Sequence, residues 1–153
     1  MPIYMLIQGV AGNSASNLYP NGFDILSFSW GESFIFSAGG GGSGRADFSS
    51  LSVMLSAGKG TAYLMLKGAT GGIIDEIIMV DTQMAASKEV IFERWTMDNV
   101  VISSYQISGD GGAKPVVSLS LTFDKLKFEQ FVPRADGSHG DPDTVSVTNP
   151  NGP

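Results

Sequence analysis

The stretch FDILSFSWGESFIFSAGGGGSGRADF, residues Phe23–Phe48, indicates the fold class. The large apolar side chains of its first part share one parity: Leu26, Phe28 and Trp30. Successive side chains of a strand point to opposite faces, so this pattern predicts a strand over residues 23–37 that is buried on one face. The opposite parity carries Ser27 and Ser29, which we expect on a polar face.

A glycine-rich excursion over about residues 38–47 follows this strand and leads into a third strand over residues 46–56. Glycines cannot pack a core, so the excursion is expected to leave the fold. Its candidate contact residues are Gly39, Gly40, Gly41, Gly42, Ser43, Gly44, Arg45 and Asp47. The pattern argues against a phosphate-binding loop, because a strand follows where a helix is required and the Lys-Ser/Thr pair is missing.

Short apolar runs recur along the chain, punctuated by 20 glycines and 7 prolines. This pattern predicts an all-β fold, a mainly antiparallel barrel or sandwich. Further strands are expected over residues 3–8, 73–81, 89–97, 100–108 and 116–131. Near the end of the last one the apolar parity changes from odd (Leu119, Leu121, Phe123) to even (Leu126, Phe128). A β-bulge near residues 124–125 would restore one buried face.

One short helix is expected over about residues 61–70, packed on the sheet. Four apolar residues recur there at i, i+3, i+4 and i+7: Ala62, Met65, Leu66 and Ala69. Such a stripe is typical of a face packed on the core. Thr61 is the expected N-cap, and Gly71 is placed to end the helix in a left-handed conformation.

The amino-acid composition limits the class of protein and the partners that the chain can have. With 153 residues, 42% of them hydrophobic and 16% charged, the chain is expected to form one globular domain over residues 1–132. Residues 133–153 are predicted to be a polar tail, ordered only where a neighbour holds it. A net charge of −6 argues against nucleic-acid and anionic-membrane partners. No apolar run is long enough to span a membrane, and Met1–Gly12 lacks the basic start of a secretory signal.

No catalytic or metal-binding constellation is evident, so neither an enzyme nor a cofactor is expected. The chain has no cysteine and a single histidine, His139, within the tail. Asp75 and Glu76 are adjacent on an expected strand, so their carboxylates face opposite ways and cannot act on one substrate.

Three segments resemble the Hcp family (haemolysin-coregulated protein), the tube subunits of bacterial type VI secretion, which are related to phage tail-tube subunits. DILSFSWG at residues 24–31, with Gly44-Arg45 opening the next strand, is similar to the family's DVLSFSWG strand and its GR. VVISSY at residues 100–105 and SLSLTFDKLKF at residues 118–128 resemble the family's VIVSS and VSLNFSKIKWEY strands. The matching segments follow one another in the family's order, and the resemblance extends from the N-terminus to about Val132.

The resemblance implies a homo-hexameric ring that stacks into a hollow tube, with Ser27 and Ser29 facing the lumen and the glycine-rich excursion contacting the next ring. It also implies a trimeric VgrG-type spike protein, a contractile sheath and baseplate, and small effector cargo. Assembly in the bacterial cytoplasm and export without a signal peptide are the expected route.

Three other functions stay open at this point. A monomeric β-sandwich binding module would use Trp30, Trp95 and Tyr105 as exposed platforms for carbohydrate. A hydrolase is the weakest alternative, because no nucleophile, base and orienting group can be assembled. A tail-tube subunit of a phage-like contractile particle differs from the secretion tube only in the strand motifs.

Overall fold

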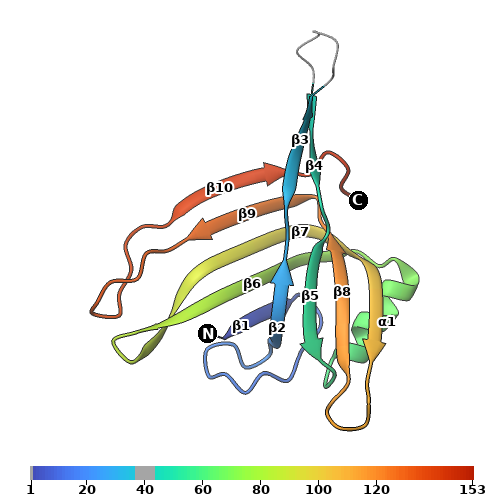
Figure 1. Ribbon diagram of the computed structural model, residues 1–153, viewed down its shortest axis with the longest axis horizontal. Helices are drawn as coiled ribbons and strands as arrows, with labels where there is room; N and C mark the ends of the chain where they lie inside the picture. Colours follow the sequence, from blue (N-terminus) through green and yellow to red (C-terminus); the bar gives the residue numbers. More distant parts are fainter. Residues whose placement is uncertain (1, 37–43) are drawn as a thin grey trace.

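The structure, a computed structural model, describes residues 2–36 and 44–153. It is an antiparallel β structure with one short helix (Figure 1). The elements are β1 (Ile3–Ile7), β2 (Phe23–Ser29), β3 (Glu32–Phe36), β4 (Gly44–Phe48), β5 (Leu51–Ser56), α1 (Thr61–Thr70), β6 (Ile74–Ala85), β7 (Lys88–Ser108), β8 (Val116–Thr122), β9 (Lys125–Gln130) and β10 (Asp143–Thr148).

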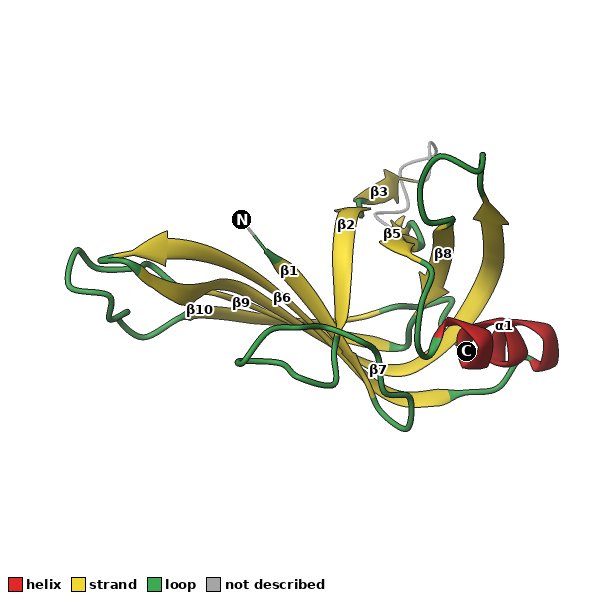
Figure 2. Ribbon diagram, turned by 90° about the horizontal axis from the view of Figure 1, so that it is seen from below, coloured by secondary structure: helices red, strands yellow, loops and turns green. Residues whose placement is uncertain are grey.

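Six strands close into a barrel, which confirms the predicted fold class. Their order is β7-β6-β1-β2-β5-β8, and β8 pairs back with β7. Strands β9 and β10 extend the sheet from the first half of β7. Together with β6 and β7 they form a wing that extends to one side of the barrel (Figure 2). The expected core residues Leu119, Leu121 and Phe123 are buried inside the barrel.

The long strand β7 belongs to both the barrel and the wing. Residues 89–97 and 100–108, expected as two strands, form one strand that passes through Asn99 with a positive φ of 51°. Asparagine tolerates this left-handed conformation, so the strand bends without ending. The β-bulge expected near residues 124–125 lies opposite this bend, at the point where β8 ends and β9 begins. There the Asp124 amide donates a hydrogen bond to the Asp98 carbonyl at 3.0 Å.

The prediction for Leu26 is wrong, because its side chain is 57% exposed. The register between β2 and β5 shifts between Ile25 and Ser27. Before the shift, Phe23 and Ile25 point into the core. After the shift, Phe28 and Trp30 pack on the core. Such a bulge inserts one residue and exchanges the faces of the residues beyond it. The shift therefore leaves Leu26 on the outside.

The expected strand over residues 23–37 is also interrupted. Strand β2 ends at Ser29, and β3 begins at Glu32 and pairs only with β4. The expected strand over residues 46–56 is divided in the same way into β4 and β5. The result is a two-stranded hairpin, β3–β4, that projects from the barrel (Figure 1). Of the expected excursion, residues 38–43 lie outside the described residues, and Gly44, Arg45 and Asp47 belong to β4.

The tail is held by its own chain rather than by a neighbour. Its segment β10 pairs with β9 from Asp143↔Gln130 to Thr148↔Lys125. The Asn149 side-chain amide is buried and donates to the Phe123 carbonyl at 3.0 Å. Val147 packs on the core cluster, so strand pairing, a buried hydrogen bond and an apolar contact together hold this segment.

The helix forms where it was expected, but with the opposite face inward. Its buried residues are Thr61 and Leu64, while the stripe of Ala62, Met65, Leu66 and Ala69 is exposed. Gly60, in a left-handed conformation, occupies the N-cap in place of Thr61. Gly71 ends the helix with φ 65°, as predicted.

Candidate assembly surfaces

The outer face of the barrel carries two rows of small polar side chains that cross four neighbouring strands. Strand pairing aligns one row from β2 to β7: Ser29, Ser52, Ser120 and Ser104. The second row, parallel to it, consists of Ser27, Met54, Ser118 and Gln106. We call these eight residues the serine face. It contains no charged residue, and Met54 is its one large apolar side chain.

Sequence reasoning identified only Ser27 and Ser29 of this face, and both are exposed in the structure. Ser52, Ser104, Ser118 and Ser120 were missed. The signal was present as serines at alternate positions of three further strands, but only the pairing register shows that they align. Neighbouring hydroxyls also interact across the strands: Ser103 Oγ donates to the Ser120 carbonyl at 3.0 Å, and Thr122 Oγ1 donates to Ser103 Oγ at 3.3 Å.

The β3–β4 hairpin presents one aromatic and one mixed face. Phe34 and Phe36 lie on the aromatic face with their ring centroids 4.9 Å apart, and the ring of Phe34 packs against the backbone of Gly44. Ile35 points to the other face together with its cross-strand partner Arg45. Every residue of β3 is exposed. A lone two-stranded hairpin has marginal stability in water, so an exposed hairpin of this kind is a candidate contact surface.

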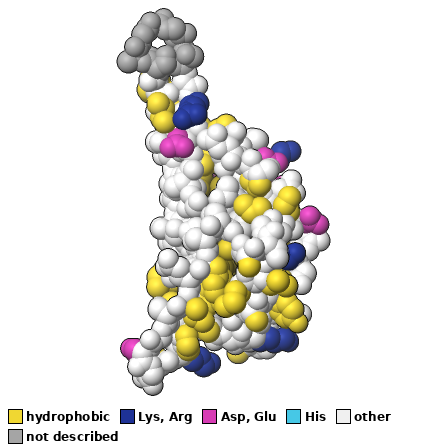
Figure 3. All heavy atoms as spheres, turned by 90° about the vertical axis from the view of Figure 1, so that its right-hand side faces the viewer, with side chains coloured by type: hydrophobic (Ala, Val, Ile, Leu, Met, Phe, Trp, Pro, Cys, Tyr) yellow, Lys and Arg dark blue, Asp and Glu magenta, His cyan; other side chains and the backbone are white. Residues whose placement is uncertain are grey.

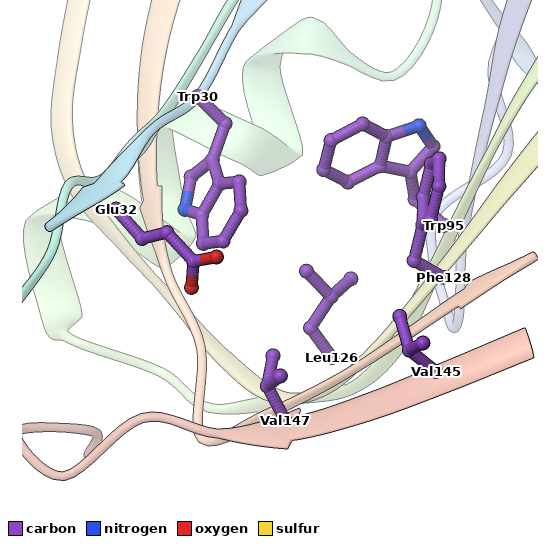
Figure 4. A pocket seen from close by; sticks show the side chains of 7 residues that line it. All are labelled: Trp30, Glu32, Trp95, Leu126, Phe128, Val145 and Val147. Carbon is purple, nitrogen blue, oxygen red and sulfur yellow. The ribbon is translucent and has the colours of Figure 1, made fainter. Parts of the chain in front are cut away.

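Beneath the hairpin, seven side chains line an apolar hollow of about 190 Å³: Trp30, Glu32, Trp95, Leu126, Phe128, Val145 and Val147 (Figure 4). This volume is below the roughly 300 Å³ at which small-molecule sites begin. The two indoles pack edge to face with centroids 5.9 Å apart and lie against the core. Tyr105 packs on the core as well, so none of the three aromatic residues stands free as a carbohydrate platform.

An ion pair on the opposite side of the wing ties β9 to β7. Arg94 donates from Nε to Glu129 Oε1 at 2.8 Å and from Nη2 to Oε2 at 3.0 Å. These hydrogen bonds lower the pKa of Glu129 and raise the pKa of Arg94 relative to their ordinary values. The Arg94 guanidinium also lies 5.4 Å from the centre of the Phe131 ring. The pair stabilises the sheet next to β10, which is its edge strand.

Two carboxylates oppose each other across β6 and β7 in the wing, Asp81 and Glu93. Burial raises the pKa of each, and the charge of Asp81 raises the pKa of Glu93 further. Nowhere in the described part of the chain do three or more metal-ligating side chains come together as a group that could hold an ion. Among residues 2–36 and 44–153, no helix has the length and apolar character required to cross a membrane.

A closed β-barrel with a projecting apolar hairpin and a winged sheet defines the class of small antiparallel β-barrel subunits. A family model described as "Type VI secretion system effector, Hcp" matches residues 4–130. The chain therefore belongs to the Hcp family of type VI secretion, whose members are secreted structural tube proteins rather than enzymes.

Solved structures share the fold. One, described as a type six secretion system protein, is 20% identical, with 96% of this chain and 94% of that chain covered and a TM-score of 0.86. Hcp1 from Salmonella typhimurium is 21% identical, with 99% and 96% covered and a TM-score of 0.78. A type VI secretion system effector from Yersinia pestis is 16% identical, with 95% and 98% covered and a TM-score of 0.76. A search of curated protein sequences finds no match.

Proposed function

We propose that this chain forms hexameric rings that stack into the hollow inner tube of a type VI secretion system, with the serine face lining the lumen. The observation that carries the proposal is the alignment of small, uncharged side chains across β2, β5, β8 and β7. Small hydroxyls hydrogen-bond to water and give a passing protein neither an apolar patch nor a fixed charge to bind. Such a surface suits a conduit for small effectors.

Two further surfaces suit the contacts between copies. Strand β10 is the edge of the eight-stranded sheet, and an unpaired edge is a template for association. Head-to-tail contacts between identical copies satisfy such an edge in every copy and close a ring. We assign the β3–β4 hairpin, including Arg45 and Asp47, to the contact between stacked rings. Each permanent interface is expected to bury on the order of 2,000 Å².

Family membership supports the remaining partners of the proposal. In the proposed assembly, a trimeric VgrG-type spike protein caps the tube, and a contractile sheath on a baseplate surrounds it. The tube forms in the bacterial cytoplasm and is expelled when the sheath contracts. The chain needs no cofactor in this role, because every step assigned to it is a contact between protein surfaces.

Light scattering and negative-stain microscopy of the purified chain test this proposal. The expected particle is a ring with six times the 16.1 kDa mass of one chain. A particle of 16.1 kDa that persists at high protein concentration, with no annular images, would contradict it.

A further inference from the structure

The outward face of α1 has the composition of a buried surface, although none of residues 2–36 and 44–153 covers it. Tyr63 is 64% exposed, Met65 48% and Leu66 57%, and Ile73, just beyond the helix, is 55% exposed. On the side of the molecule that carries α1, apolar side chains gather at some distance from the projecting hairpin (Figure 3). A contiguous apolar surface of this kind marks a protein contact. We call these four residues the α1 patch.

Charge around the α1 patch differs from charge elsewhere in the chain. Residues 57–72 contain Lys59 and Lys67 and no acidic residue, so this segment has a net charge of +2 within a chain of net charge −6. Lys67 lies in the last turn of α1, where a cation is favourable to the helix dipole. The α1 patch therefore fits a partner that is apolar and carries negative charge.

The β3–β4 hairpin has this character. Phe34 is 54% exposed and Phe36 79% exposed on one face. Glu32 lies on that face near the barrel, and the described hairpin residues, 32–36 and 44–48, carry a net charge of −1. Within one chain the hairpin and α1 point to different sides of the barrel (Figure 1). A contact between them thus requires two copies, and such a contact is head-to-tail.

We propose that the α1 patch is the docking site for the aromatic face of the β3–β4 hairpin of a second copy. This inference rests on the proposed function, because it names the receptor for the hairpin in the assembled tube. Docking buries Phe34 and Phe36 of one copy against Met65 and Leu66 of the other. It brings the acidic base of the hairpin near the lysines that flank the helix.

Cysteine crosslinking tests the contact directly, since the chain has no native cysteine. Single variants Leu66→Cys and Phe36→Cys are mixed in equal amounts under assembly conditions and treated with a short bismaleimide. The control mixture pairs Phe36→Cys with Leu18→Cys, because Leu18 is also about half exposed but belongs to the loop between β1 and β2 and not to α1. The expected yield of linked dimer is at least about tenfold higher for the first mixture than for the control.

A second measurement covers the case in which the introduced cysteines disturb assembly. Leu66→Asp is expected to lower the assembled fraction at least about fivefold, whereas Leu18→Asp leaves it unchanged and both retain the circular dichroism of the folded chain. If rings and tubes form, but crosslinking equals the control and Leu66→Asp assembles normally, the α1 patch binds something else and the inference is wrong. If the unmodified chain forms no rings at all, the proposed function itself fails.

Discussion

The serine face and the β3–β4 hairpin are both exposed, yet they differ in what they offer to their surroundings. The serine face is uncharged and consists mainly of hydroxyl side chains, and every strand beneath it is paired. The hairpin projects and exposes Phe34, Ile35 and Phe36, and its described strands, β3 and β4, pair with each other. The hydroxyls of the first surface can hydrogen-bond to water, whereas the second surface exposes large apolar side chains. In the proposed assembly, the serine face therefore lines the lumen, and the hairpin makes the contacts between copies.

The largest effect is expected from Phe36→Ser, compared with Ser29→Ala on the serine face. Because Phe36 is 79% exposed, its replacement should lower the assembled fraction at least tenfold and change the free energy of unfolding by less than about 0.5 kcal/mol. Ser29→Ala should change neither quantity. Sedimentation velocity and urea unfolding measure the two quantities. Equal assembly of the two variants would remove the distinction between the surfaces.

Glu129→Gln tests a contact that serves the subunit rather than the assembly. Loss of the bidentate pair with Arg94 should lower the free energy of unfolding by about 1–2 kcal/mol at pH 7. The pKa of Glu129 is lowered in the folded state, so its contribution is present above the ordinary carboxyl pKa and is lost as the pH falls through the lowered value.

The difference between Glu129→Gln and the unmodified chain should therefore shrink in urea titrations repeated below about pH 4. The exposed carboxylate of Asp75 supplies the control, and Asp75→Asn should stay within about 0.5 kcal/mol of the unmodified chain. A pH-independent loss would show that packing, and not the ion pair, is responsible.

Glu93→Gln should act in the opposite direction. The pKa of Glu93 is raised by burial and by Asp81, so its ionised form reduces stability at neutral pH, and this penalty disappears as the pH falls. The variant should gain about 0.5 kcal/mol at pH 7, a value reduced by solvent screening at this half-buried site. The gain should vanish below about pH 4. Destabilisation at pH 7 would indicate that the carboxylate has a favourable partner.

The smallest effect is expected at a glycine on the inward face of α1. Gly68 lies on the inward face, where an added Cβ would be 3.4 Å from Ile102 Cγ2 and 3.5 Å from Tyr105 Cβ, both ordinary contact distances. Gly68→Ala should therefore raise the free energy of unfolding by about 0.5 kcal/mol through helix propensity. Gly60→Ala, at the N-cap, should instead lower the free energy of unfolding. Gly60 has φ 92°, and a Cβ there would clash with the Ala11 carbonyl. In thermal unfolding, Gly68→Ala should melt at a higher temperature than Gly60→Ala.

Alternation and glycine punctuation were sufficient to predict an antiparallel barrel or sandwich and the inward positions of Phe28, Trp30 and Leu121, and helical spacing with Gly71 gave the helix bounds. Leu26 was mispredicted because a bulge changes parity without a local sequence signal at that point. The α1 stripe was mispredicted for a different reason. Helical periodicity marks an apolar face, but it does not show whether that face packs on the core of the same chain. The serine face needed the register of four strands, which depends on contacts distant in sequence.

A cryo-electron microscopy reconstruction of the assembled particle tests the central claim most directly, because it shows which surface faces the axis. The account predicts a ring whose lumen is lined by Ser29, Ser52, Ser104 and Ser120, with Phe34 and Phe36 buried between copies. A particle with these serines on its outer surface, or with the hairpin free in solvent, would contradict it.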